Sequence, residues 1–397
     1  MPPLTFTEAR ALVIDKVLHA RRLPDIEFVE LDAADGRVLC APLGADRDYP
    51  PFHRSLRDGF AVRAADVPGT LDVIGEVRAG HRFEGTIQPG QSVTIMTGAP
   101  VPEGADAVVM LEDASLQETS VTISNPVQPG EHVCARGTEA QAGATVLKSG
   151  QVIGYPEMAV LATIGLLKAP VYRRPQVAII TTGDEIRDAR ESPQEHQIRD
   201  SNLWSLACQI RRAGGTPVVF PAARDNVTDI ADAIGKGLQT DLLVMSGGVS
   251  AGKYDLVENV LKLYGAEFYF DRVQIQPGRP AVFGRAKDTF FFGLPGNPAS
   301  TMVCFELFAR PALELLSGRN STLLPLTESV LAVDFDHRPG LTRFLPAVLS
   351  EDGARITPVP WTSSGDVMAL ARANVFLVAE PDKPHYAAGE RIRVLMR

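Results

Sequence analysis

The chain has 397 residues, of which 45% are hydrophobic and 22% charged, the composition of a globular protein with a substantial core and several domains. The net charge of −9 argues against general nucleic-acid binding, and no apolar run is long enough to span a membrane. The four cysteines are widely spaced without a CxxC pair, so we expect reduced thiols in a cytoplasmic protein rather than zinc ligands or disulfides.

Two segments of the chain predict a helical support. Thr7 is placed to cap a helix that runs to about Ala20, and Pro156 stands near the start of a second helix, Tyr155–Ala162. We expect these helices to pack together in an elongated support domain made of residues 1–45 and 141–173. Packing of the N-terminal helix on the following sheet domain is the alternative.

Residues 46–140 predict a β-rich domain inserted into this support. Proline and glycine separate short apolar runs, a pattern typical of strands joined by many turns. The runs are Val73–Val77, Ser92–Met96, Ala107–Leu111 and Val121–Ile123. The segment Pro50–Ala61 brings Ser, Arg and Asp side chains into one turn, and from spacing alone a solvated loop is its slightly favoured interpretation.

Residues 174–321 alternate predicted strands with predicted helices. The strands are Gln176–Thr182, Pro217–Pro221, Leu242–Met245 and Thr289–Gly293, with further strands expected in 268–284. Ser201–Arg212 has apolar residues at helical spacing. This order predicts an α/β domain with an open, mostly parallel sheet covered on both faces, whose ligand lies beyond the carboxyl ends of the strands.

The stretch 241–255 organises this domain. Its buried strand stops at SGGVS (246–250), where two glycines allow a tight turn whose N–H groups and serine hydroxyls suit a phosphate or a similar oxyanion. Asp255 is placed to cap a helix at Leu256–Tyr264. A plain strand-to-helix turn is the alternative interpretation.

Two more loops follow predicted strands, TTGDE (181–185) and LPGNPAS (294–300). In the second loop, Asn297 is expected to cap a helix that begins at Pro298. Because the carboxyl ends of parallel strands share one edge of the sheet, the three loops should converge. Their convergence favours a ligand site more strongly than any one loop does.

Residues 322–397 predict a small β-barrel or sandwich. The expected strands are Val330–Phe335, Phe344–Leu349, Ile356–Val359, Val375–Val378 and Arg391–Leu395. One loop, Trp361–Asp366, has the polar composition of a functional loop and precedes a helix-like stretch, Val367–Ala373.

Together the motifs resemble those of the molybdopterin molybdenumtransferases, the MoeA and gephyrin E-domain family. They are TTGDE (181–185), RDSN (199–202), SGGVSAGKYD (246–255), QPGRP (276–280) and GLPGNPAS (293–300), joined by SLRDGFAV (55–62) and MTGAPVPEGADAVV (96–109). The resemblance covers essentially the whole chain. It implies a MogA-like α/β domain within an elongated homodimer of four domains.

The resemblance also implies a reaction and a site. The family takes adenylylated molybdopterin and molybdate, transfers molybdenum to the dithiolene sulfurs and releases AMP. The site lies between the sheet domain of one subunit and the β-rich insertion of the other. Matching positions with catalytic roles are Asp58, Glu139, Asp184, Glu185, Asp225 and Asp255. Matching positions that bind substrate are Ser55, Thr97, Thr182, Gly183, Ser246, Gly247, Gly248, Ser250, Pro295, Gly296 and Asn297.

The chemistry of these side chains suits such a reaction. Asp184, Glu185 and Asp255 are hard oxygen ligands of the type that Mg²⁺ accepts. Molybdate is a tetrahedral dianion that needs cationic or hydroxyl donors. The candidate donors are Arg272, Arg279 and Ser364.

The chain departs from the family pattern at four places. Gln276 stands where lysine is usual, Glu139 follows Thr138 where an acid is usual, and Arg54 replaces a small amide or acid. Pro346 stands where arginine is common. Each change alters the charge expected at the site, since glutamine offers only a neutral donor.

These departures leave an alternative function, a catalytically weakened family member that acts as a dimeric pterin-binding scaffold or adaptor. The sheet domain alone also resembles MogA-type adenylyltransferases, but the insertion and the barrel argue against that reading. A transient contact with such an adenylyltransferase, or with enzymes that accept the cofactor, is expected instead. The cysteines and histidines are assigned no role.

Overall fold

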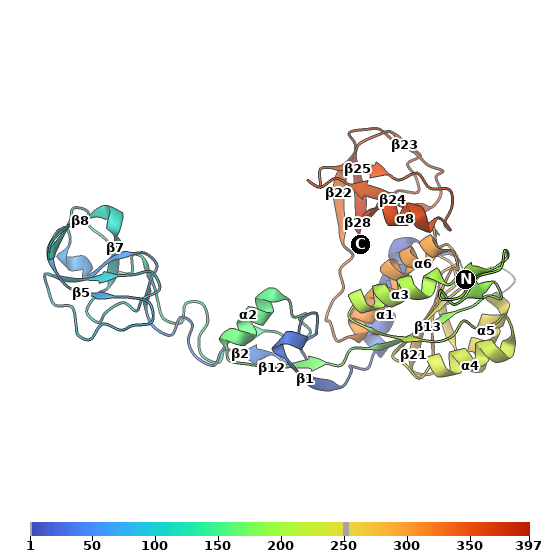
Figure 1. The fold of residues 1–397 in the computed structure, drawn as a ribbon, viewed down its shortest axis with the longest axis horizontal. Helices are drawn as coiled ribbons and strands as arrows, with labels where there is room; N and C mark the ends of the chain where they lie inside the picture. Colours follow the sequence, from blue (N-terminus) through green and yellow to red (C-terminus); the bar gives the residue numbers. More distant parts are fainter. Residues whose placement is uncertain (1, 249–253) are drawn as a thin grey trace.

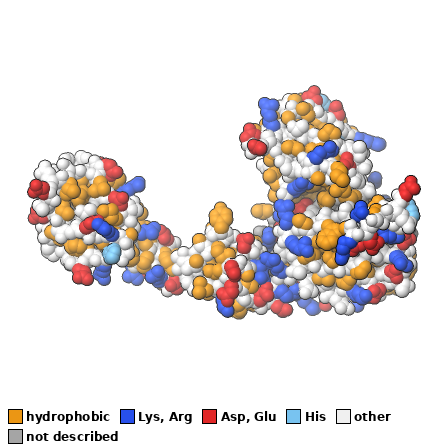
Figure 2. Space-filling model, viewed as in Figure 1, with side chains coloured by type: hydrophobic (Ala, Val, Ile, Leu, Met, Phe, Trp, Pro, Cys, Tyr) orange, Lys and Arg blue, Asp and Glu red, His pale blue; other side chains and the backbone are white. Residues whose placement is uncertain are grey.

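The computed structural model describes residues 2–248 and 254–397, without the side chains of Tyr254 and Asp255. The chain forms a long body with a bend (Figure 1). A β-rich module (residues 46–140) lies at one end, and a slender support module (residues 21–45 and 141–173) follows it. A sheet module (residues 5–20 and 174–321) lies at the other end, with a C-terminal barrel (residues 322–397) beside it. The β-rich module stands clear of the sheet module in the space-filling view (Figure 2).

The sheet module contains the predicted open sheet. Its six strands lie in the order β16 (Thr216–Val219), β13 (Gln176–Thr181), β17 (Leu242–Ser246), β21 (Thr289–Leu294), β20 (Val282–Ala286) and β18 (Glu267–Phe270). The first four are parallel, and β20 runs antiparallel to them. Strand β18 pairs antiparallel with β20 and so runs in the direction of the first four. The predicted fold class, an α/β multidomain protein with a mostly parallel sheet, is therefore confirmed.

Side chains alternate between the two faces of the buried strands, so each face has its own core. One face packs on α3 (Ser201–Arg212), α6 (Pro298–Cys304), the π-helix η4 (Phe305–Ala309) and α7 (Arg310–Leu316). The other face packs on α4 (Val227–Gly237) and α5 (Tyr254–Leu263). Asp255 lies inside α5, so its prediction as the cap residue of that helix is wrong.

The N-terminal helix α1 (Phe6–Ala20) belongs to the sheet module. Thr5, rather than the predicted Thr7, caps it: the Thr5 hydroxyl accepts from Glu8 N, and the Glu8 carboxylate accepts from Thr5 N, which forms a capping box. Its apolar side packs in the same core as α7, and Arg10 donates to the Leu307 carbonyl at 3.0 Å. The expectation that this helix packs on Tyr155–Ala162 is therefore wrong.

The support module has a small core of its own. Strand β1 (Ile26–Glu30) pairs with β12 (Lys168–Tyr172), and β2 (Leu43–Gly44) pairs with β11 (Thr145–Leu147). Helix α2 (Tyr155–Thr163), the predicted second helix, packs on these strands. A short 3-10 turn, η1 (Leu31–Ala33), precedes β2.

The β-rich module has a six-stranded sheet with a core on each face. The order is β7 (Ala107–Met110), β4 (Gly59–Val62), β6 (Gln91–Ile95), β5 (Gly69–Val77), β9 (Ser120–Ile123) and β8 (Ala114–Gln117). Strand β3 (Arg54–Ser55) pairs with β10 (Val133–Cys134), and η2 (Ala64–Asp66) and η3 (Leu111–Asp113) are short turns. The predicted solvated loop 50–61 therefore contributes two strands.

The C-terminal module is a closed barrel. Strands β24 (Thr342–Leu349), β25 (Arg355–Pro358), β22 (Leu326–Leu331), β28 (Arg391–Met396) and β26 (Val375–Ala379) pair in that order, and a β24–β26 pairing closes the ring. The short strands β23 (Phe335–Asp336) and β27 (His385–Tyr386) pair beside it, and α8 (Val367–Arg372) follows the 361–366 loop. Strand β19 (Ile275–Gln276), which comes from the sheet module, pairs with β24. The barrel is thereby attached beside the strand ends of the sheet.

None of the described helices combines the length and the apolarity that crossing a membrane requires.

Candidate active site

A cavity of about 1100 Å³ lies at the carboxyl ends of β13, β17 and β21, between the sheet module and the C-terminal barrel. The position is the one expected for a ligand of a mostly parallel sheet. Its wall comprises residues 181, 182, 185, 186, 198–202, 246–248, 275–280, 295–298, 300, 341, 343, 361–365 and 367. The three predicted loops therefore converge, and the barrel supplies part of the wall through β24 and the 361–366 loop.

The turn after β17 brings bare backbone close to its neighbour. Gly247 has φ +90°, and a Cβ built on it would lie 2.6 Å from the Thr182 carbonyl oxygen. Gly248 has φ +68° and is similarly close to the Thr182 hydroxyl. Side chains would collide there, so both glycines are required for the close approach. The Gly247 N–H donates to Leu294 O at 3.1 Å, so this group is already used.

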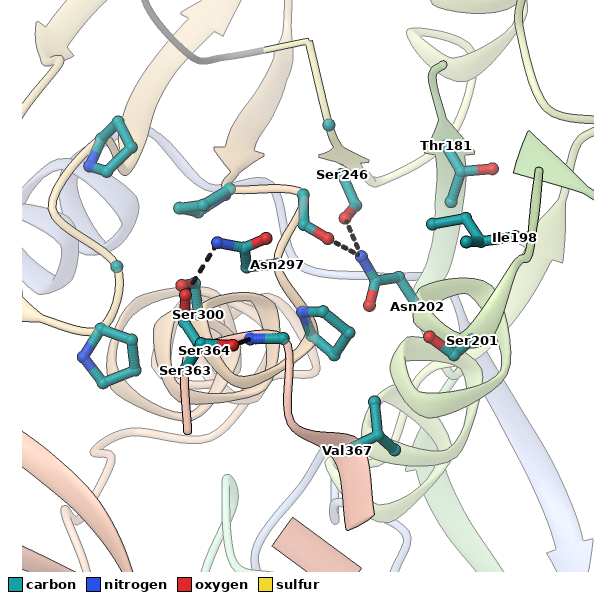
Figure 3. Close-up of a pocket in the computed structure, with 18 of the residues that line it drawn as sticks. Thr181, Ile198, Ser201, Asn202, Ser246, Asn297, Ser300, Ser363, Ser364 and Val367 are labelled. Atoms are coloured by element: carbon teal, nitrogen blue, oxygen red, sulfur yellow. Dashed lines mark hydrogen bonds between the residues drawn. The ribbon is translucent and has the colours of Figure 1, made fainter. Parts of the chain in front are cut away.

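A hydrogen-bond chain ties the three loops together (Figure 3). Asn202, in the first turn of α3, donates to Ser246 Oγ at 3.0 Å and to Gly296 O at 2.7 Å. Ser246 Oγ also lies 3.3 Å from Thr301 Oγ1. Asp200 caps α3 through Leu203 N and accepts from the Thr181 hydroxyl at 2.6 Å, which fixes the start of the helix against β13.

The barrel is bonded to the last of these loops. Asn297 stands at the predicted cap position of α6, but its side chain makes no capping bond. Instead its Nδ2 donates to Ser364 Oγ at 2.7 Å, and Ala299 N donates to the Ser364 carbonyl at 2.9 Å. Ser364, predicted as a molybdate donor, therefore lies in the cavity wall and joins the barrel to the sheet module.

Three arginines make the cavity wall cationic: Arg199 from β15 (Ile198–Arg199, paired with β14, Ile186–Arg187), Arg279 and Arg343. Among the wall residues that the structure describes, they outnumber the two carboxylates, Glu185 and Asp200. Burial, and then the neighbouring Arg338, lower the pKa of Arg343. A guanidinium that is partly desolvated beside another cation gains from an anionic ligand.

The predicted substrate residues divide into those in the wall and those outside it. Those in the wall are Thr182, Ser246, Gly247, Gly248, Arg279, Pro295, Gly296, Asn297 and Ser364. Gly183 and Arg272 are not wall residues. Ser250 lies outside the described residues.

The predicted acidic residues do not form one cluster. Glu185 lines the cavity, whereas Asp184 and Asp225 lie outside its wall and bond to each other's backbone, at 3.2 Å and 3.4 Å. The Asp255 side chain lies outside the described part of the chain. Within residues 2–248 and 254–397, no group of three His, Cys, Asp or Glu side chains is arranged to hold a metal ion.

The remaining predicted residues lie in the β-rich module, at the far end of the same chain (Figure 1). Asp58 accepts from Thr97 N at 2.6 Å and from Thr97 Oγ1 at 2.8 Å, and these two bonds, the backbone one first, lower the pKa of Asp58. Ser55 is buried and its hydroxyl bonds to the Arg57 backbone. Glu139 pairs with Arg54 at 2.5 Å.

This last pair explains two of the departures from the family pattern, because Arg54 and Glu139 neutralise each other. Pro346 is buried in the barrel strand β24 and is not a wall residue, so its replacement of an arginine removes no charge from the wall itself. Gln276 does line the cavity, and in the β19–β24 pairing it lies opposite Arg343. A cation therefore stands beside the position where the expected lysine is missing.

Four wall residues that carry useful chemistry were given no individual role from the sequence: Arg199, Asn202, Arg343 and Trp361. Arg199 and Asn202 belong to the RDSN motif (199–202), and that motif was the signal from which they could have been found. Arg343 and Trp361 come from the barrel: Trp361 belongs to the predicted functional loop 361–366, whereas nothing in the local sequence indicates that Arg343 faces the sheet module.

The chain combines a MogA-like sheet module that has a strand-end cavity with an inserted β-rich module and a closed C-terminal barrel. This combination defines a class of molybdopterin-related proteins. Comparison with known proteins agrees with this class. Family models match in chain order: the MoeA N-terminal region (domain I and II) over residues 4–165, a probable molybdopterin binding domain over 178–315 and the MoeA C-terminal region (domain IV) over 328–396. The chain belongs to the MoeA family of molybdopterin molybdenumtransferases.

Individual relatives match over nearly their whole length. A molybdopterin molybdenumtransferase of a Nostoc species is 35% identical over 94% of this chain and 88% of its own. That of Bacillus subtilis is 33% identical over 96% and 92%. A solved MoeA structure from Pyrococcus horikoshii has a TM-score of 0.82 at 27% identity and covers 100% of both chains.

Proposed function

We propose that this protein is a molybdopterin molybdenumtransferase, which inserts molybdenum from molybdate into adenylylated molybdopterin and releases AMP. The observation that carries the proposal is the cationic cavity at the strand ends, in a chain of the MoeA family. The scaffold alternative has no observation of its own in its favour.

The cavity suits an anionic substrate with a pyrophosphate bond. The glycine turn after β17 allows a phosphate to approach the backbone, and Arg199 and Arg279 supply positive charge to oxygens that become more negative as the bond breaks. Arg343 and Ser364 provide a guanidinium and a hydroxyl for the molybdate dianion. The barrel forms one side of the cavity.

The reaction is proposed to use Mg²⁺, which neutralises phosphate charge when bound. The carboxylates of Glu185 and Asp184 are oxygen donors of the type that Mg²⁺ takes, and the two residues are consecutive in the loop after β13. Asp255 is the proposed third ligand. Substrate phosphate oxygens would complete the coordination, as is common for this ion.

The active unit is proposed to be a homodimer. The β-rich module lies far from the cavity of its own chain (Figure 1). The residues that it contributes, Asp58, Thr97, Ser55 and Glu139, can therefore reach a cavity only in a second copy. A pKa held low keeps Asp58 charged over the physiological range. Asp58 would then provide an anionic group at the edge of the partner's cavity.

We also propose the four-domain division expected from the sequence. The support domain comprises residues 1–45 and 141–173, the insertion domain 46–140, the molybdopterin-binding domain 174–321 and the barrel domain 322–397. Separate apolar cores support it, although α1 packs on the molybdopterin-binding domain. A cytoplasmic location and transient contact with a MogA-type adenylyltransferase or with cofactor-accepting enzymes complete the proposal.

The test is AMP release from adenylylated molybdopterin with molybdate and Mg²⁺. We expect release by the wild type and its loss in Asp58→Ala and Asp255→Ala. Binding of the pterin nucleotide without AMP release would refute the transferase proposal.

A mixing experiment tests the shared site. Chains carrying Asp58→Ala and chains carrying Glu185→Ala are each expected to be inactive. In a mixed dimer, one of the two sites combines the intact residues, so co-expressed and co-purified chains should regain part of the activity. Mixtures that stay as inactive as each variant alone would place both residues in the same chain's site.

A further inference from the structure

The barrel contributes an aromatic side chain to the cavity. Trp361, at the start of the loop between β25 and α8, is a wall residue. Among the wall residues that the structure describes, it is the one aromatic side chain. Trp361 is only partly buried, so a ligand in the cavity can reach it.

The indole of Trp361 and the loop that follows it are held in place. The indole packs against the core on one face of the sheet and against the core of the barrel. Within the loop, Asp366 accepts from Thr362 N at 3.3 Å and from Ala369 N at 2.9 Å, and Ser364 Oγ accepts from Asn297. A side chain that is fixed before binding loses little conformational freedom when a ligand packs on it.

The cations of the wall and its aromatic ring suit different parts of a ligand. Arg199, Arg279 and Arg343 attract oxyanions. The face of an indole carries partial negative charge and does not attract an oxyanion, but it stacks on the face of a flat heteroaromatic ring. The edge of the indole has one N–H donor, which an oxyanion can accept from, so this second role has to be tested against the first.

We propose that the indole of Trp361 stacks on a flat heteroaromatic ring of the substrate. The inference rests on the proposed function, since adenylylated molybdopterin contains two such rings, the pterin and the adenine. The barrel then takes part in binding the heterocycle as well as the oxyanions. Stacking of one base on an aromatic side chain strengthens binding about 5–150-fold, the equivalent of about 1–3 kcal/mol.

The contact can be observed directly because the chain has two tryptophans, Trp204 and Trp361. Full-length protein labelled with fluorotryptophan is titrated with AMP in one arm and with neopterin in the other, and Trp204→Phe assigns the two fluorine NMR signals. In one arm the Trp361 signal should shift, because a stacked ring changes the local magnetic field. Trp204 is 53% exposed and is not a wall residue, so its signal should stay. The arm that shifts the Trp361 signal identifies the ring.

Two variants separate stacking from donation by the indole N–H. Trp361→Phe keeps an aromatic face and removes the donor, whereas Trp361→Leu removes both. In calorimetric titrations, Trp361→Phe should bind the identified compound within about threefold of the wild type, and Trp361→Leu should bind it about tenfold more weakly. Molybdate and inorganic phosphate should bind equally to all three proteins. Trp204→Leu is the matched control and should bind the compound as the wild type does.

Four results would overturn the inference: neither compound shifts the Trp361 signal, neither compound binds, Trp361→Leu binds as tightly as the wild type, or Trp361→Phe loses as much affinity as Trp361→Leu. The NMR titration uses the wild-type sequence and stands even if Trp361→Leu does not fold. Failure here differs from failure of the proposed function. AMP release can occur with the heterocycle held elsewhere, and stacking can be present in a protein that releases no AMP.

Discussion

Replacing Gly247 with alanine tests whether the turn after β17 requires bare backbone. The alanine would keep φ near +90°, and its Cβ would lie 2.6 Å from the carbonyl oxygen of Thr182. That oxygen belongs to the backbone at the end of β13, so it cannot turn away as a flexible side chain could. The substitution therefore tests the contact that brings the two loops together.

The expected loss of folding free energy in Gly247→Ala has two parts. The left-handed conformation costs an alanine about 1–2 kcal/mol, and the overlap costs about 1–3 kcal/mol more. Gly214 provides the matched control in the same module, with φ +89° and nothing within 4 Å of a built Cβ. Gly214→Ala should therefore show only the first part, and both variants share the gain from a less flexible unfolded chain.

Hydrogen exchange measured by mass spectrometry reports the free energy of opening for β13 and β17 separately from the other modules. Amides in these strands should exchange about 5–150 times faster in Gly247→Ala than in Gly214→Ala, the equivalent of about 1–3 kcal/mol. AMP release should fall only in Gly247→Ala. Equal exchange rates in the two variants would show that the approach to Thr182 does not require a glycine.

Three further outcomes follow from the side chains. Arg343→Gln should raise the molybdate concentration needed for half-maximal AMP release about tenfold or more, whereas Arg272→Gln, outside the cavity wall, should not. Thr97→Val should raise the pKa of Asp58, measured by carboxyl NMR titration, because the hydroxyl donor is lost. In the wild type, the stability from these bonds is complete above the ordinary aspartate pKa and is lost as the pH falls through the lowered value. Glu314→Gln should lower the free energy of unfolding by about 3 kcal/mol, because this carboxylate is only 3% exposed and pairs with two arginines.

Each of these outcomes has a contradicting result. A similar molybdate requirement for both arginine variants would remove Arg343 from the anion site. An Asp58 carboxyl that titrates at its ordinary value would mean that the Thr97 bonds do not persist in solution. For Glu314, the control is Glu328→Gln, which breaks an exposed pair with Arg391 and should cost less than about 1 kcal/mol. Similar losses of unfolding free energy in Glu314→Gln and Glu328→Gln would contradict the argument that burial makes the Glu314 ion pairs more important to stability.

Much of the sheet module could be predicted because local pattern and final structure agree there. The helix Ser201–Arg212 has the predicted bounds, since its apolar spacing matches one buried face and Asp200 caps it. The cap of α1 was misplaced because two threonines, Thr5 and Thr7, stand near the start of the helix, and Thr7 lies inside it. The spacing of Thr5 and Glu8, a capping box, was the signal that distinguishes them.

Nearly all of the predicted wall residues belong to the sheet module, and Ser364 of the barrel is the exception. Parallel strands bring their carboxyl ends to one edge, so three loops were placed together from their positions alone. Arg343 was missed because its place in the wall depends on the pairing of β19 with β24, which joins two modules. Such pairing depends on tertiary docking and leaves no periodic pattern in either strand.

The position of α1 has a consequence for how the protein is made. This helix is synthesised long before its partners in the core, which include α7, and the bond from Arg10 to Leu307 spans 297 positions. The ribosome must therefore complete the support and β-rich modules, and nearly all of the sheet module, before α1 can dock. Closing so long a loop slows folding, and until then the apolar side of α1 is exposed to chaperones and to other nascent chains. Docking of α1 thus depends on the synthesis of nearly all of the sheet module.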